Sequence, residues 1–132
     1  MKTLAMLVGL LVVASNAVAK DQIVKRSNVE KKAIAAIQKL GGIVEFAEKK
    51  PGKPVICVFL FDTNVTDAGL VHLKGLTELQ KLWLSATKVT DAGLVHLTGL
   101  TNLQTLYLSS TDVTDAGVKK LQAALPKCKI VR

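Results

Sequence analysis

One phrase of the chain returns at a fixed interval, and this interval constrains the fold more than any other feature. The segment VTDAGLVHLKGLTELQKLWLSATK begins at Val65, a close copy, VTDAGLVHLTGLTNLQTLYLSSTD, begins at Val89, and a shortened copy, VTDAGVKKL, begins at Val113. The period is 24 residues without a gap. Periods of this length are typical of chains that stack one structural unit on the next, so the sequence predicts a solenoid.

Each repeat joins a strand pattern to a helix pattern. In the second copy Leu82 and Leu84 alternate with Trp83, which is typical of a strand with both leucines facing one side. Thr90 precedes a helical run and is predicted to cap it, with Asp91 in the first turn. One coil cannot bury its own leucines, so stacked coils are expected to share a continuous core.

The ends of the helical runs can also be predicted. Gly99 is expected to end the second run, because glycine takes a left-handed conformation cheaply. In the last repeat we expect a helix over residues 115–124 and a short strand over residues 129–131, which finishes the sheet.

The whole unit reads L-x-x-L-x-L-x-x-T-x-V-T-D-A-G-L-x-x-L-x-x-L, and it resembles the leucine-rich repeat. More narrowly it is similar to the T-D-A-G-L variety of exported bacterial proteins, and the resemblance covers residues 55–132. It implies an α/β fold: a short solenoid with a parallel sheet on the concave face and helices on the convex face. Many such repeats place Asn where Thr63, Thr87 and Thr111 stand here, and we expect these threonines to bond to the neighbouring coil.

The chain is expected to have three parts: a signal peptide at residues 1–19, an N-terminal cap at 20–54, and repeats with a C-terminal cap at 55–132. The first part has the pattern of a secretory signal peptide. It has a basic start, an apolar run from Leu4 to Ala14 and an A-x-A cleavage signal that ends at Ala19. We therefore expect the mature protein in the periplasm or outside the cell.

The cap is predicted to be a helix followed by a hairpin. Ser27 and Glu30 form the pattern of a capping box at the start of an amphipathic helix. The pair Gly41-Gly42 predicts its end, residues 43–47 predict a strand, and the segment EKKPGKP predicts the turn that leads into the first repeat strand.

The distribution of charge along the chain limits the classes of partner that we expect the protein to bind. The 132 residues carry a formal net charge of +8, with both ends basic and the middle not. A nucleic-acid interface needs a continuous basic track, so we do not expect one. The basic ends are expected either to contact an anionic envelope weakly or only to keep the protein soluble.

The aromatic residues point to a binding surface. Side chains alternate across a strand, so Trp83 is expected to face away from the leucine core. The same position holds Phe59 and Tyr107 in the neighbouring coils, and strands about 4.8 Å apart would stack the three rings. An exposed apolar row favours a binding site for a protein segment or a polysaccharide, whereas rings that only stabilise the sheet are the alternative. The predicted ligand-binding residues are Phe59, Phe61, Lys81, Trp83, Ser85, Thr105, Tyr107 and Ser109.

No other pattern favours catalysis, a metal or a cofactor. His72 and His96 share a repeat position, but the next equivalent residue is Lys120, and a metal usually needs three or four ligands. We interpret the repeated aspartates as helix starts. We therefore predict a non-enzymatic binding module, with a structural, self-associating envelope protein as the alternative.

The two cysteines are expected to stay unpaired. Cys57 lies on the first repeat strand and Cys128 near the fourth, so about 14 Å separates them across three strand spacings. A disulfide needs Cα atoms within about 7 Å. The two thiols are therefore expected to be unpaired within the monomer. Separately, we expect the protein to be a monomer or a weak dimer.

Overall fold

The computed structural model describes the backbone of residues 17–132 and the side chains of residues 28–132. The apolar run of the predicted signal peptide lies outside the described residues. The described elements, where η marks a 3₁₀ helix, are α2 (Ala17–Lys39), β1 (Ile43–Phe46), β2 (Val55–Phe59), η1 (Asp67–Gly75), β3 (Lys81–Trp83), α3 (Asp91–Leu94), η2 (Val95–Leu97), β4 (Thr105–Tyr107), α4 (Asp115–Ala124) and β5 (Lys129–Val131).

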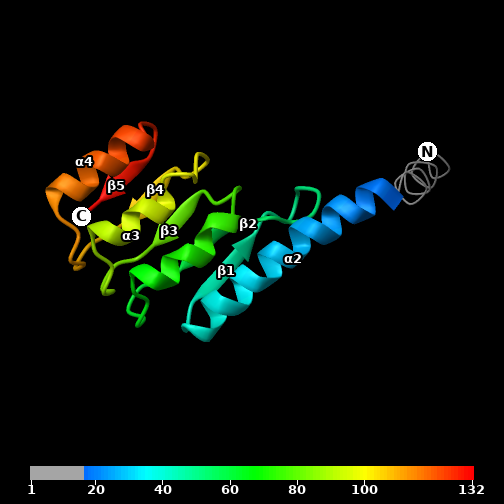
Figure 1. Cartoon of the computed structure of the whole chain (residues 1–132), viewed down its shortest axis with the longest axis horizontal. Coiled ribbons are helices and arrows are strands. Elements are labelled where there is room, and N and C mark those ends of the chain that lie inside the picture. Colours follow the sequence, from blue (N-terminus) through cyan, green and yellow to red (C-terminus); the bar gives the residue numbers. More distant parts are fainter. Residues whose placement is uncertain (1–16) are drawn as a thin grey trace.

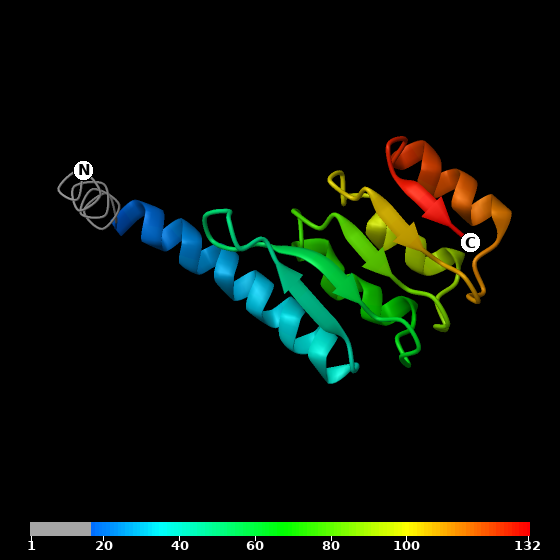
Figure 2. The ribbon, with the colours of Figure 1, turned by 180° about the vertical axis from the view of Figure 1, so that it is seen from behind.

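The strands form one five-stranded sheet in the order β1-β2-β3-β4-β5. Strand β1 runs antiparallel to β2, and every later neighbour is parallel. The register aligns Val58, Leu82, Leu106 and Ile130, as the 24-residue period predicts. The helical segments lie on one face of the sheet (Figure 1), and we call the other face the open face. Seen from behind, α2 and β1 lie at one end of the stack and α4 and β5 at the other (Figure 2).

The core is a continuous layer of aliphatic side chains between the sheet and the helical segments. Leu82 and Leu84 of the middle coil are fully buried, and so are Leu106 and Leu108 at the same positions one coil later. Burying one such side chain contributes about 1.5–3 kcal/mol. The predicted inward alternation of the leucines is therefore confirmed, and it turns the residues between them toward the open face.

The helical segments of the first two coils are wholly or partly 3₁₀ in geometry. The first is the 3₁₀ helix η1, and the second is the four-residue α3 continued by η2. Thr90 caps α3 as predicted, because its hydroxyl accepts a hydrogen bond from the N–H of Ala92 at 3.3 Å. The predicted bounds of the last helix and the last strand agree with α4 and β5.

The second helical run ends without the left-handed glycine that the sequence predicts. The expected left-handed conformation of Gly99 is wrong, since Gly99 is not among the described residues with a positive φ. Left-handed residues lie in another part of the coil, at the third position after β2, β3 and β4, and all three carry a side chain. They are Asp62, Ala86 and Ser110, with φ of 55°, 56° and 59°.

Helix α2 begins earlier than predicted. It starts at Ala17, so Ser27 lies inside the helix and the predicted capping box with Glu30 is wrong. Residues 17–26 hold no Gly or Pro, so nothing in them interrupts a helix once it has formed. The end of the helix is as predicted, because Gly41 follows it with a φ of 87°. Strand β1 then pairs along β2.

Cys57 and Cys128 are both free, which confirms the predicted unpaired thiols. They lie in β2 and directly before β5, at separated strands of the sheet. Within the described part of the chain, no helix combines the length and the apolar composition needed to cross a bilayer.

Candidate binding surface on the open face

Three aromatic rings stack across the open face, one from each of three neighbouring strands. The register pairs Phe59 with Trp83 and Trp83 with Tyr107. The ring centroids of Phe59 and Trp83 lie 4.5 Å apart at an interplanar angle of 20°, and those of Trp83 and Tyr107 lie 4.9 Å apart at 13°. All three side chains are half-buried. The predicted ladder of rings is thus confirmed, and we call these three residues the aromatic row.

Aliphatic residues continue the aromatic row at both ends. The register of the sheet places Ile43 of β1 next to Phe59 and Val131 of β5 next to Tyr107. Ile43 is 63% exposed. The sequence interpretation missed Ile43, although its predicted hairpin contained the necessary signal. Pairing β1 antiparallel to β2 across the turn brings Ile43 opposite Phe59 and onto the same face.

Phe61 extends the apolar surface beyond the end of β2. It is 54% exposed, and the repeat period places it in line with Ser85 and Ser109, which are half-buried. The chain segments that carry this line lie side by side, because the N–H of Asp62 donates to the carbonyl of Ser85 at 3.0 Å. The open face therefore combines one exposed ring with small hydroxyl side chains.

A more polar line borders the aromatic row on its other side. The register aligns Glu45, Cys57, Lys81, Thr105 and Lys129. Glu45, Lys81 and Lys129 are exposed, and Thr105 is half-buried. Cys57 is buried, although it lies in register with the exposed Lys81 on the same face. Burial raises the pKa of the Cys57 thiol, and the neighbouring Glu45 carboxylate raises it further, so the thiol stays protonated at neutral pH.

The threonines after the strands bond differently from the prediction. The hydroxyl groups of Thr63, Thr87 and Thr111 each donate, at 2.6 Å, to the carbonyl of the residue three positions earlier. The expected ladder to the neighbouring coil is therefore wrong. These threonines hold the turn inside their own coil, where a hydroxyl reaches a nearby carbonyl more easily than the next strand.

Contacts between coils come from the aspartates of the T-D-A-G phrase. Asp67 accepts hydrogen bonds from the backbone N–H of Thr90 at 2.7 Å and from its hydroxyl at 2.6 Å. Asp91 accepts from the N–H of Thr114 at 2.7 Å and from its hydroxyl. Each aspartate thus binds the threonine that begins the next helical segment. The sequence interpretation assigned these residues to their own helix starts and missed the link to the following coil.

The glycine of the phrase makes room for that link. A Cβ built on Gly93 would overlap the carboxylate of Asp67, and one built on Gly117 would overlap that of Asp91. We call this arrangement of aspartate, threonine and glycine from adjacent coils the Asp–Thr–Gly contact. The third aspartate, Asp115, meets no further coil among the described residues, and its carboxylate pairs with the Arg132 guanidinium.

The two histidines differ in their surroundings. His72 is exposed, whereas His96 is half-buried with its Nδ1 atom buried and without a hydrogen-bond partner among the described residues. The described residues contain no group of three or more His, Cys, Asp or Glu side chains that could hold a metal ion. His96 alone therefore defines no site.

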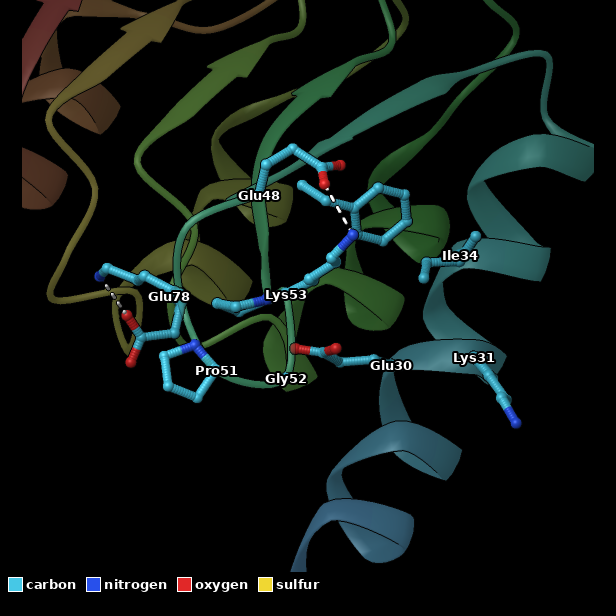
Figure 3. Close-up of a pocket in the computed structure, with 11 residues that line it drawn as sticks. Glu30, Lys31, Ile34, Glu48, Pro51, Gly52, Lys53 and Glu78 are labelled. Carbon is cyan, nitrogen blue, oxygen red and sulfur yellow. Dashed lines mark hydrogen bonds and ion pairs between the residues drawn. The ribbon is translucent and has the colours of Figure 1, made fainter. Parts of the chain in front are cut away.

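A separate cavity of about 640 Å³ lies between α2 and the β1–β2 turn. Lys31 and Ile34 line it from the helix, and Lys53 lines it from the turn (Figure 3). Acidic and basic side chains both line it, and two ion pairs form there, Lys53 with Glu48 at 2.8 Å and Lys50 with Glu78 at 3.4 Å. The cavity therefore offers no uniform charge for a ligand.

Residues 99–121 match the protein family described as Leucine Rich repeat. A comparison with curated proteins finds no match. Among solved structures, the chain is similar to the crystal structure of an internalin from Listeria monocytogenes, with 32% sequence identity and a TM-score of 0.40. That similarity covers 46% of this chain and 17% of the internalin, so the chain spans less than a fifth of its length. The family match, together with the stacked 24-residue coils, supports a leucine-rich repeat protein.

Proposed function

We propose that this chain is an exported, non-enzymatic module that binds an extended segment of another protein along the aromatic row. Leucine-rich repeat similarity suggests a protein-interaction module. The observation that carries the proposal is the apolar strip from Ile43 to Val131, with Phe61 exposed beside it. The polar line that contains Lys81 and Thr105 supplies hydrogen-bonding groups for a peptide backbone.

The stacking geometry favours a protein segment over a polysaccharide. Sugar rings bind aromatic side chains by lying on the flat face of the ring. Both faces of Trp83 are covered, by Phe59 on one side and Tyr107 on the other. The row therefore presents ring edges to a ligand, and ring edges carry the partial positive charge that suits carbonyl oxygens and the sulfur of methionine.

Export and processing are part of the same proposal. Cleavage after Ala19 would leave Lys20 as the first residue, and most of α2 would remain in the mature chain. Helix α2 and the β1–β2 hairpin would then close the first coil as an N-terminal cap. Intact-mass analysis of the secreted chain tests this, and a mass that includes residues 1–19 would contradict it.

Trp83 is the chain's only tryptophan and reports binding directly. A random peptide library displayed on phage is panned against the immobilised full chain, and the selected peptides are titrated while Trp83 emission is followed. Phe61→Ser introduces the residue that stands at this position in the next two coils, so it removes a ring while preserving the fold. We expect it to weaken peptide binding by about fivefold or more, as the loss of an interface aromatic does.

Val95→Ser is the matched control, because Val95 is 64% exposed but lies on the helical face. It should leave peptide affinity unchanged. A glycan array probed under the same conditions separates the two ligand classes. Selected peptides that bind Phe61→Ser and wild type equally, or glycans that bind where no peptide does, would contradict the proposal.

A second candidate function is self-association through the open face, in a structural role. The exposed Ile43 and Phe61 favour it, because contiguous apolar side chains on a surface mark contact sites. Sedimentation should then show an association that Phe61→Ser abolishes, and Trp83 emission should shift to shorter wavelength as the protein concentration rises.

We also propose that the basic C-terminal end makes weak contact with anionic envelope surfaces. Co-sedimentation with vesicles containing anionic lipid should decrease as salt is added. Binding that does not depend on salt would contradict this contact. The exposed basic residues there are Lys119, Lys120, Lys127, Lys129 and Arg132.

A further inference from the structure

The sheet has two edge strands of unlike character, and their backbone groups can be assigned. The N–H of Lys129 donates to the carbonyl of Gln104, and the carbonyl of Val131 accepts from the N–H of Leu108. Both of these β5 residues therefore face β4. Backbone groups of successive residues in a strand point to opposite sides, so the N–H and carbonyl of Ile130 point away from the sheet. Among the described residues, nothing lies in sheet register beyond β5.

The same reasoning applies to β1 at the other edge. The carbonyl of Ile56 and the N–H of Leu60 bond toward β3, so the intervening Cys57 and Phe59 point their backbone groups toward β1. Their register partners, Glu45 and Ile43, therefore face β2. The residue between them, Val44, points its N–H and carbonyl outward.

The two outward edges match in register, in hydrophobicity and in charge. If Val44 of one copy bonds to Ile130 of another in an antiparallel pair, Ile43 lies opposite Val131 and Glu45 lies opposite Lys129. The first pair continues the aromatic row, and the second joins opposite charges on the polar line beside it. Val44 and Ile130 are both half-buried hydrophobic residues packed against the core, so this pair continues the leucine layer.

We propose that a second copy of this chain adds its β1 to β5 of the first copy, head to tail, and extends the sheet across the junction. Symmetric pairings fit less well. Two β5 edges centred on Ile130 would place Lys129 opposite the partner's Val131, and would bring two basic ends together. Two β1 edges centred on Val44 would place Ile43 opposite the partner's Glu45. Complementary edges at opposite ends of one chain give an open-ended assembly, in which the mean mass rises without a plateau at the dimer.

Charge exchange tests the junction in the full chain. Glu45→Lys places two lysines at the junction, and Lys129→Glu places two acids there. Each change should weaken the association measured by sedimentation in low salt by about tenfold, because like charges directly opposite each other destabilise a strand pair. The chain with both changes restores an acid–base pair and should associate like wild type. An equimolar mixture of the two single variants should also associate, because each supplies the edge that the other needs.

A second variant tests the backbone. Ile130→Pro removes the outward N–H, and Ile130 does not use that group to bond β4. It should prevent association while the melting curve shows that the protein is folded. If the proline destabilises the protein, the charge variants still test the proposal. Glu45 and Lys129 are exposed, so changing them should not unfold the protein.

The results can contradict the proposal in several ways. It is wrong if the wild-type chain is monomeric at about 1 mM, the limit of weak specific association. It is also wrong if the single variants associate as well as wild type, or if the doubly changed chain fails to recover. Association that Lys129→Glu strengthens would show a symmetric β5 interface instead. Association that is abolished by Phe61→Ser but unchanged by both charge variants would show pairing through the open face.

Discussion

The repeated T-D-A-G phrase is explained, residue by residue, by contacts across the coil boundary. Asp67 holds the N–H and hydroxyl of Thr90, and Gly93 leaves the space that the carboxylate occupies. The phrase is contiguous in sequence, yet its parts serve different boundaries. Asp67 and Asp91 serve the boundary ahead of them, whereas Thr90 and Thr114, with Gly93 and Gly117, serve the boundary behind them. In the middle copy, which has a boundary on each side, the aspartate, the threonine and the glycine are all in use.

A methyl group at Gly93 should therefore destabilise the fold. Gly93→Ala would press a Cβ into the Asp67 carboxylate, and overpacking of this kind costs about 1–3 kcal/mol of unfolding free energy. Gly99→Ala is the matched control, because a Cβ at Gly99 would meet no atom within 4 Å. Its effect should stay within about 0.5 kcal/mol.

Urea denaturation measures both changes. Combining Gly93→Ala with Asp67→Ala should cost less than the sum of the single changes, since the clash and the carboxylate share one site. Strict additivity would show that the glycine is needed for another reason.

The contact at Asp91 should make stability depend on pH in the acid range. The Thr114 hydroxyl, and then its N–H, donate to Asp91 and lower the pKa of this carboxyl below its ordinary value of 3.8. The unfolded chain therefore binds more protons than the folded chain between the two pKa values. The contribution to stability is fully present above pH 3.8, and it is lost as the pH falls through the folded-state pKa.

Thermal melts of wild type and Asp91→Ala should consequently differ at pH 7 and converge in strong acid. Asp112→Ala provides the control, because this exposed residue lies outside the Asp–Thr–Gly contact. A difference between wild type and Asp91→Ala that is the same at every pH would show that the carboxylate charge makes no contribution.

At the scale of the element, side chains on both faces of the sheet stabilise strands that are only three residues long. Leucines such as Leu82 anchor the inner face, and the aromatic row runs across the outer face. The sequence predicted this arrangement because alternation and period are both visible in the residue order. It did not predict the burial of Cys57 or the position of Ile43, because both depend on how β1 pairs across the hairpin.

Removal of the central ring should cost more than the loss of an ordinary surface residue. From sequence alone, Trp83→Ala is expected to change stability by no more than about 1 kcal/mol, as at exposed sites. The structure shows two stacked partners, and each aromatic pair contributes about 0.5–1.5 kcal/mol beyond its buried area.

We therefore expect Trp83→Ala to lose about 1–3 kcal/mol, measured by chemical denaturation followed by circular dichroism. Trp83→Phe retains a ring between Phe59 and Tyr107 and should lose less. Equal losses in the two variants would mean that the stack itself does not stabilise the sheet.

At the scale of the whole molecule, the 24-residue period made the architecture predictable. It did not predict which side chains form hydrogen bonds within a coil and which form them between coils. It identified which residues share a row across the coils, so the sheet order, α4 and β5 followed from the sequence. It could not show whether the side chain of Thr87 reaches its own coil or the next one. That choice depends on the left-handed turn at Ala86, which no glycine or asparagine marks in the sequence.

The shared core predicts that the described coils unfold together. Buried leucines run without a break from the first coil to the last, so no coil retains a core when its neighbour is lost. The far-ultraviolet circular dichroism of the whole chain and the emission of Trp83 in the middle coil should give coincident denaturation curves. Separate midpoints for the two signals would contradict a single cooperative unit.

The Asp–Thr–Gly contact has a consequence for how such a gene can change length. Because both boundaries between the repeats use the same three partners, an extra copy produced by unequal recombination in frame would find a matching aspartate before it and a matching threonine and glycine after it. The tandem array can therefore lengthen or shorten by whole units while each new junction is already compatible. Selection would then act mainly on the two terminal segments, which have no counterpart in the array.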